Sequence, residues 1–265
     1  MIFHSAFDNS YLWLPLIGFL VGMIGTLIGG GGGFFFIPVL TLLFNVPAQI
    51  ALTTSLAATL PICIIGSIVH YRNGNIDIRV GSVFAIAGIF GALAGATLTS
   101  LISPGHLKIS WGIYAILMAA NMIISNWIKK RNKANGIEKP GISKFEKIAK
   151  SSFFGFLAGV ITATFGTSGA TPVQAGLFTM RMPVKVVIGT TLLVVMVNTA
   201  SALGAHFLVG DMDLTLVYFI TAGTIVGALL GPKLLDRVKL DRVEGPIRQW
   251  YALGMIAFGI LMIIS

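Results

Sequence analysis

The sequence Ile28-Gly29-Gly30-Gly31-Gly32-Gly33-Phe34 places five consecutive glycines inside an apolar region of the chain. Because glycine has no Cβ, such a run can adopt positive φ angles and approach another backbone closely. One apolar segment, residues 11–28, ends at this run, and a shorter one, residues 34–44, follows it. The second segment is shorter than the roughly 20 residues that a straight helix needs to cross a bilayer. We therefore favour a glycine-broken helical hairpin, or broken helices, that turn near the middle of a membrane, and two tilted crossings are the alternative.

The composition of the whole chain is that of an integral membrane protein. Its 265 residues are 55% hydrophobic and 10% charged, with a mean hydropathy of +0.91, whereas soluble domains carry roughly 25% charged residues. Between Asp8 and His70 there is no charged residue and no histidine, a stretch long enough to cross a bilayer more than once. The first residues contain no Lys or Arg, so we expect no cleaved signal peptide.

The charged residues and the cysteine exclude several classes of function. The net charge of +9 does not indicate a nucleic-acid partner, because the basic residues lie in short connections between apolar segments. The single cysteine, Cys63, provides neither a disulfide framework nor a multi-cysteine metal site. The nine acidic residues fall in expected loops and tails, and no catalytic triad can be assembled at one depth. We therefore expect no enzyme activity, no metal and no cofactor.

The chain contains an internal repeat. The sequence GFLVG at residues 18–22 recurs as GFLAG at residues 155–159, an offset of 137, and at an offset of 136 His70 matches His206. We expect two repeats, residues 1–128 and 151–265, joined by a polar connector at residues 129–150. The expected helical segments are residues 11–28, 34–44, 50–69, 80–102 and 109–128 in the first repeat, and 152–165, 170–179, 184–208, 214–230 and 247–264 in the second.

The basic residues predict the orientation of the repeats, because Lys and Arg are concentrated in cytoplasmic loops. Placing the connector in the cytoplasm puts 17 of the 18 basic residues inside, with only Lys108 outside. Both termini are then outside, and the two hairpins enter from opposite sides. We therefore expect an all-α polytopic membrane protein of two inverted repeats, each with a glycine-broken hairpin and three long transmembrane helices. Transporters frequently have this architecture.

The glycine turn is a candidate anion-binding site. A helix N-terminus presents unpaired N–H groups and the positive end of a dipole, and the glycine run opens the segment 34–44. The corresponding turn of the second repeat is Gly166-Thr167-Ser168-Gly169, before the segment 170–179. If both turns reach the midplane, two helix N-termini and two hydroxyls converge there. The alternative is that the glycines only permit close helix packing.

Hydroxyl side chains inside two longer segments extend this candidate site. Thr53, Thr54 and Ser55 lie in the segment 50–69, and Thr190 and Thr191 occupy the corresponding place in the second repeat. These hydroxyls could donate hydrogen bonds to the oxygens of an anion. Alternatively, they bond only to carbonyls of the preceding helical turn.

Two amides and two histidines complete the set of candidates. Asn198 and Gln174 lie in apolar surroundings, which is typical of functional residues or of helix–helix hydrogen bonds. His70 and His206 could gate the pathway or sense pH, or anchor the helices at the membrane interface. The predicted substrate-binding residues are Gly29, Gly30, Gly31, Gly32, Gly33, Phe34, Thr53, Thr54, Ser55, Gly166, Thr167, Ser168, Gly169, Gln174, Thr190, Thr191 and Asn198.

Several of these stretches carry a resemblance to a known family. In the first repeat they are the sequences at residues 25–31, 53–55 and 70–77, together with Phe34 and Pro38. In the second repeat they are residues 189–191 through Asn198, and His206 through residues 210–213. With these stretches, spread over nearly the whole chain, the sequence resembles the TauE/SafE family, also called the sulfite exporter or toluenesulfonate uptake family.

The resemblance implies a secondary transporter for a small sulfur-containing anion in the plasma membrane of a bacterium or archaeon. Sulfite, thiosulfate and organosulfonates are the implied substrates, and either H⁺ or Na⁺ could be the coupling ion. The second turn, at residues 166–169, has fewer glycines than the family pattern. Two other interpretations stay open, a passive anion channel and a membrane scaffold without cargo.

Overall fold

The computed structural model describes residues 2–134, 143–207, 211–237 and 240–264, and these residues form an all-helical protein. Short elements accompany the helices, namely η1 (Asn9–Trp13), η2 (Val39–Leu43) and the paired strands β1 (Ile2–Phe3) and β2 (Met212–Asp213). The predicted all-α class is confirmed. The helices in the described ranges are α1 (Leu14–Ile28), α2 (Gly33–Pro38), α3 (Ala48–Arg72), α4 (Ile78–Ser100), α5 (Pro104–Ala134), α6 (Lys144–Phe165), α7 (Ala170–Thr179), α8 (Val184–Phe207), α9 (Leu214–Arg237) and α10 (Leu240–Ile264).

Among the described residues, seven helical segments are long and apolar enough to cross a membrane. α5 and α6 both continue into the range expected to be a polar connector, because α5 ends at Ala134 and α6 begins at Lys144. Lys is a good helix former, so the lysines of this range are compatible with helix. The Ser143 hydroxyl accepts a hydrogen bond from the N–H of Glu146 at 3.1 Å and thereby caps the start of α6. Residues 135–142 of the expected connector lie outside the described residues.

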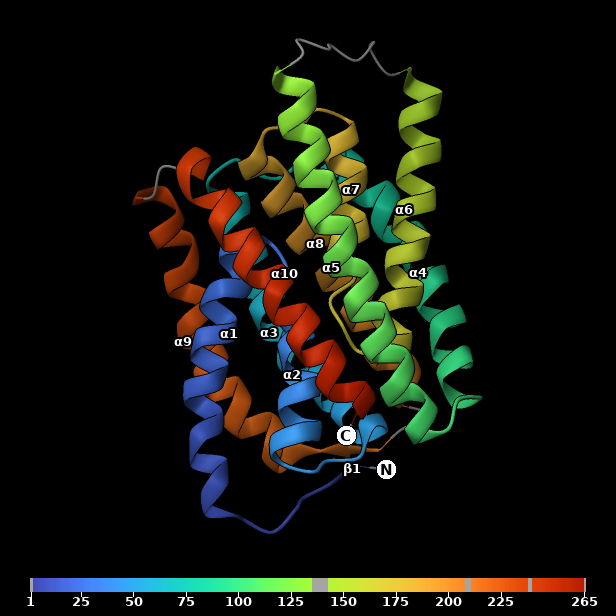
Figure 1. Cartoon of the computed structure of the whole chain (residues 1–265), viewed down its shortest axis with the longest axis vertical. Coiled ribbons are helices and arrows are strands. Elements are labelled where there is room, and N and C mark those ends of the chain that lie inside the picture. The colour runs from blue at the N-terminus through green and yellow to red at the C-terminus, as the bar shows by residue number, and fades with distance from the viewer. Residues whose placement is uncertain (1, 135–142, 208–210, 238–239, 265) are drawn as a thin grey trace.

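The glycine run ends α1 and turns the chain back. Gly29 follows α1 with a φ of 75°, and the N–H groups of Gly29, Gly30 and Gly31 all donate to the carbonyl of Gly25. Gly31 and Gly32 also have positive φ angles, 64° and 79°, which glycine adopts without steric cost. In Figure 1 the chain rises through α1 from the lower end of the molecule. It then returns to that end, where α3 begins. The predicted glycine-broken hairpin is present.

A corresponding turn, residues 166–169, separates α6 from α7. Gly166 and Gly169 have φ angles of 59° and 56°, so this turn also needs glycine where the chain leaves one helix and enters the next. In Figure 1 α7 lies in the upper half of the molecule and α2 in the lower half. The two short helices therefore lie towards opposite ends of the structure.

Helices of the two halves pack in exchanged pairs. α1 packs along α9 and α6 packs along α4, while α3 contacts α8 and α5 contacts α10. A Cβ built on Gly159 would lie 2.0 Å from the carbonyl oxygen of Gly88, and one on Gly223 would lie 1.8 Å from that of Pro15. Small residues permit such close backbone contact in membranes. Close packing therefore explains the glycines of α1, α4, α6 and α9.

Enlarging Gly159 should push α6 away from α4. In Gly159→Leu the new Cβ would collide with the Gly88 carbonyl, and overpacking of this kind costs about 1–3 kcal/mol. Thermal unfolding in detergent should therefore show a lower Tm. The control Gly204→Ala, on α8, places its Cβ where no atom of the described residues lies within 4 Å and should not lower the Tm. A Gly159→Leu protein as stable as the wild type would contradict this contact.

Candidate functional site

The two glycine turns meet in the interior of the protein. A Cβ built on Gly31 would lie 3.4 Å from the Cβ of Ser168, and one on Gly33 would lie 3.4 Å from the carbonyl oxygen of Gly166. All residues of both turns are buried. The two turns that the sequence expected to converge therefore lie in direct contact, and we call this contact the junction.

Ser55 on α3 ties the two turns together. Its Oγ lies 3.0 Å from the carbonyl oxygen of Gly33 and 3.0 Å from that of Gly166. The side chain is fully buried. A hydroxyl donates one proton, so the two carbonyls share it. The structure thus gives Ser55 a bridging role between the two halves of the chain.

Gln174 on α7 closes the C-terminal end of α1. Its Nε2 donates to the carbonyl oxygen of Ile28 at 2.8 Å. The last carbonyls of a helix have no partner within that helix, so this bond satisfies one of them. The structure therefore places Gln174 in a hydrogen bond between helices, one of the two roles that the sequence left open.

Two α3 side chains that the sequence did not indicate also face the junction. The Oγ1 of Thr59 would lie 2.7 Å from a Cβ on Gly33, and the Sγ of Cys63 would lie 2.8 Å from one on Gly31. Thr59 is 1% exposed, and within the described residues its hydroxyl has no hydrogen-bond partner. Residues four apart share one face of a helix. The four-residue spacing from Ser55 to Thr59 and Cys63 could therefore have indicated that these side chains face the same turns.

The hydroxyls of Thr53 and Thr190 are engaged elsewhere. Thr53 donates to the carbonyl oxygen of Asp211 and also to that of Ile50, at 3.0 Å. Thr190 accepts the N–H of Asp77 at 2.9 Å. Both hydroxyls therefore form hydrogen bonds with the backbone of loops at helix ends, and not with the two glycine turns.

Thr54, Thr191 and Asn198 are fully buried polar side chains. No hydrogen-bond partner for their hydroxyl or amide groups lies in the ranges that the structure describes. Asn198 is at the contact of α8 with α4, because a Cβ on Gly88 would lie 2.0 Å from its Oδ1. The structure thus places Asn198 between two helices, without a bond across that contact.

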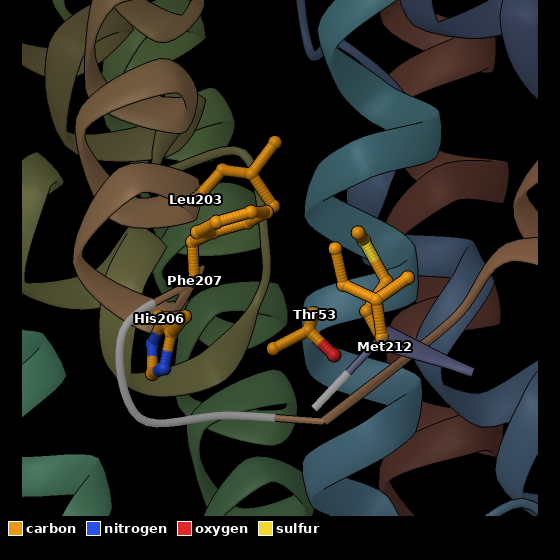
Figure 2. Close-up of a pocket in the computed structure, with 6 residues that line it drawn as sticks. Thr53, Leu203, His206, Phe207 and Met212 are labelled. Carbon is orange, nitrogen blue, oxygen red and sulfur yellow. The ribbon is translucent and has the colours of Figure 1, made fainter.

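The two predicted histidines are buried near the C-terminal ends of α3 and α8. His70 is 1% exposed and His206 is 5% exposed, so neither lies at the surface as an interface anchor would. The Nε2 of His206 lies 2.7 Å from the carbonyl oxygen of Ala163. Because a carbonyl can only accept, this nitrogen carries the proton. Figure 2 shows the small pocket that His206 lines together with Ile2, Thr53, Leu203, Phe207 and Met212.

Aromatic side chains of α5 and α10 pack against the first turn, and the sequence analysis did not include them. The ring of Phe34 stacks on that of Trp111 with centroids 4.8 Å apart, and it lies 5.8 Å from the ring of Tyr251. The hydroxyl of Tyr251 would lie 3.9 Å from a Cβ on Gly30. The tyrosine hydroxyl is therefore the polar group that this aromatic cluster presents to the turn.

A second tyrosine lies at the second turn. Tyr114 on α5 is 7% exposed and lies beside Thr167, and its hydroxyl is close enough to that of Tyr251 to interact electrostatically. The separation of the two tyrosines, 137 residues, equals the separation of Gly30 from Thr167. The same offset relates the two repeats. It could have indicated that Tyr114 and Tyr251 occupy equivalent positions beside the two turns.

The junction offers hydrogen-bond donors without fixed charge. The N-cap of α7 is Gly169, which has no side chain to accept from the first N–H groups of α7. Within the described residues, no group of three or more His, Cys, Asp or Glu could hold a metal ion. Backbone N–H groups and neutral hydroxyls are suited to the oxygens of an anion.

Removing the Ser55 hydroxyl should weaken the junction. In Ser55→Ala two buried carbonyls lose their shared donor, and an unsatisfied buried group costs about 1–3 kcal/mol. The thermal unfolding temperature in detergent should fall. Ser82→Ala is the matched control, because the exposed Ser82 hydroxyl bonds only to the carbonyl of Arg79 on its own helix. If both variants unfolded like the wild type, Ser55 would not hold the turns together.

Comparison with known proteins identifies the family. The model of the family described as "Sulfite exporter TauE/SafE" matches residues 14–262. A Bacillus subtilis protein described as probable membrane transporter protein YdhB is 32% identical over 222 residues, covering 83% of this chain and 89% of that protein.

More distant relatives have the same description. The Bacillus subtilis probable membrane transporter protein YunE is 24% identical over 88% of this chain and 92% of its own. A probable membrane transporter protein of Methanocaldococcus jannaschii is 25% identical over 86% of this chain and 88% of its own. With a family match over nearly its whole length, the chain belongs to the TauE/SafE family of membrane transporters.

Proposed function

We propose that the protein is a secondary transporter that carries a small sulfur-containing anion between its two repeats by alternating access. Sulfite, thiosulfate and an organosulfonate are the candidate substrates. The observation that carries the proposal is the junction, where one helix-breaking turn from each half of the chain meets the other in the buried interior. Membership of a family of membrane transporters supports the transport role.

The packing of α3 against α8 supports an inverted repeat. Near the start of α8, a Cβ on Gly189 would lie 2.9 Å from the Cβ of His70, near the end of α3. At the other end, Thr53 near the start of α3 lines the same pocket as His206 near the end of α8 (Figure 2). The corresponding helices therefore run antiparallel, as inverted repeats require. Rocking one repeat against the other would expose the junction to each side in turn.

The groups around the junction favour an anion over a cation. The N-terminus of α7 carries the positive end of the helix dipole, and the hydroxyls of Thr59 and Thr167 lie beside the turns. The acidic side chains that the structure describes lie at helix ends, so no carboxylate among them repels an anion at the junction. They are Asp8, Asp77, Glu146, Asp211 and Asp213.

Counterflow of labelled substrate tests this proposal without knowledge of the coupling ion. Proteoliposomes that contain the purified protein would be loaded with unlabelled sulfite, thiosulfate or methanesulfonate and diluted into a trace of the same labelled anion. A carrier should transiently accumulate label above its equilibrium level, and the flux should saturate. Flux that only equilibrates would favour the passive channel, and no flux for any of the anions would contradict the proposal.

The hydroxyl of Thr167 should contribute to anion binding. Thr167→Val removes the hydroxyl with little change of volume, and we expect it to weaken the apparent affinity about tenfold, the value of one hydrogen bond to a charged group. Thr221→Val on α9 is the matched control, because it makes the same change at a buried hydroxyl of another helix. Gly31→Leu is less suitable, because Gly31 has a φ of 64° and its Cβ would meet Cys63 at 2.8 Å.

We also propose that both termini lie outside the cytoplasm and that the segment joining α5 to α6 lies within it. Ala6 and Lys147 are exposed, and the single native cysteine, Cys63, is buried, so a new cysteine is the reactive one. In intact cells a membrane-impermeant maleimide should label Ala6→Cys and not Lys147→Cys, and opening the cells should allow both to react. The reverse pattern would overturn this orientation.

A further inference from the structure

Gly30 differs from the other glycines of its turn, because the structure leaves room for a side chain there. A Cβ on Gly29, Gly31, Gly32 or Gly33 would lie between 2.6 and 2.9 Å from a neighbouring atom. Among the atoms that the structure describes, a Cβ on Gly30 would meet one within 4 Å, the Tyr251 hydroxyl at 3.9 Å. Gly30 also lacks the positive φ of three of its neighbours. Neither packing nor backbone conformation therefore requires glycine at this buried position.

The Tyr251 hydroxyl borders the position of Gly30, and Tyr114 lies beside Thr167 in the second turn, which contacts the first turn. The Tyr251 ring is held in place by Phe34 and Phe35, with centroid distances of 5.8 and 5.2 Å. The Tyr114 ring stacks on Phe165 at 4.8 Å. Rings fixed in this way present their hydroxyls at defined places, so little conformational entropy is lost when they bind a ligand.

The second turn fills the corresponding place with a side chain. Thr167 lies 137 residues after Gly30, and it lies beside Tyr114 as Gly30 lies beside Tyr251. The two halves of the junction are therefore unequal, because one has a threonine where the other has a glycine with room for a Cβ at van der Waals distance from Tyr251. A ligand at the junction has more room on the side of Gly30.

We infer that the transported oxyanion binds in the space between Gly30 and Tyr251, where the hydroxyls of Tyr251 and Tyr114 donate hydrogen bonds to two of its oxygens. This inference rests on the proposed function and defines the chemistry of that site. A ligand of this class carries at least two acceptor oxygens on one small centre, as sulfite and sulfonates do. Neutral donors bind such an anion without the fixed charge of Arg or Lys, and binding that is not too strong permits release.

Four substitutions test the assignment on the purified full-length protein. Tyr251→Phe and Tyr114→Phe each remove one donor and keep the ring, and Gly30→Ala and Gly30→Thr fill the space in two steps. Binding of sulfite, thiosulfate, methanesulfonate, sulfate and phosphate would be measured by calorimetry and by the ligand-induced rise in Tm. Tyr218→Phe is the control, because Tyr218 is 61% exposed on α9.

Each Tyr→Phe variant should bind the preferred oxyanion about tenfold more weakly, the loss expected for one hydrogen bond to a charged group. Affinity should fall further from Gly30→Ala to Gly30→Thr, while Tyr218→Phe binds like the wild type. The Tm without ligand should stay close to that of the wild type in Gly30→Ala, because the new Cβ meets the Tyr251 hydroxyl at 3.9 Å, an ordinary van der Waals distance. A lowered Tm together with unchanged affinity would assign the tyrosines to packing and overturn the inference.

Two outcomes separate this inference from the proposed function. If the wild type binds an oxyanion and all four variants bind it equally well, the site lies elsewhere and the proposed function stands. If the wild type binds none of the five anions, both the inference and the proposed anion transport are overturned.

Discussion

Hydrogen bonding of the backbone inside a membrane is the constraint on which the rest of this structure depends. A helix that ends at membrane depth exposes carbonyl and N–H groups, and these are tolerated only where protein covers them and supplies partners. α1 ends in the interior, where the Gly25 carbonyl accepts from three N–H groups of the following turn and Gln174 donates to the carbonyl of Ile28. The Ser55 hydroxyl donates to a carbonyl oxygen of each turn, that of Gly33 and that of Gly166. Each turn is thus stable in the interior because the other turn and α3 cover it.

The exchanged packing of the two halves connects this junction to movement. α1 lies along α9 and α6 along α4, with backbones in contact at glycines such as Gly159 and Gly223. The hairpin of each half is therefore held by a long helix of the other half. In the proposed alternating access, a displacement of one pair of helices would carry one of the turns with it, and the two turns meet at the junction. The pairing of α1 with α9 and of α6 with α4 thus underlies both the close glycine packing and the proposed alternating access.

The sequence predicted the two turns well and the roles of single side chains less well. The glycine run and the turn at residues 166–169 stand out because helix breakage inside an apolar segment is a local signal. In the structure the Ser55 hydroxyl lies between two carbonyls and Gln174 caps a helix, contacts that the sequence did not specify, and their substrate-binding roles stay predictions. Thr59 and Tyr251 were not predicted, because a threonine or a tyrosine in an apolar helix looks ordinary until its neighbours from other helices are known.

By itself, the sequence determined that this chain is an all-helical membrane protein with two helix-breaking turns, because hydropathy, charge and glycine act locally along the chain. Only the tertiary structure decided which polar groups surround those turns. Ser55 on α3, Tyr114 on α5 and Tyr251 on α10 reach the junction from three helices, and no spacing along the chain fixes how those helices pack. The difference between Gly30 and its neighbours is likewise a property of packing, since open space beside a glycine depends on residues distant in sequence.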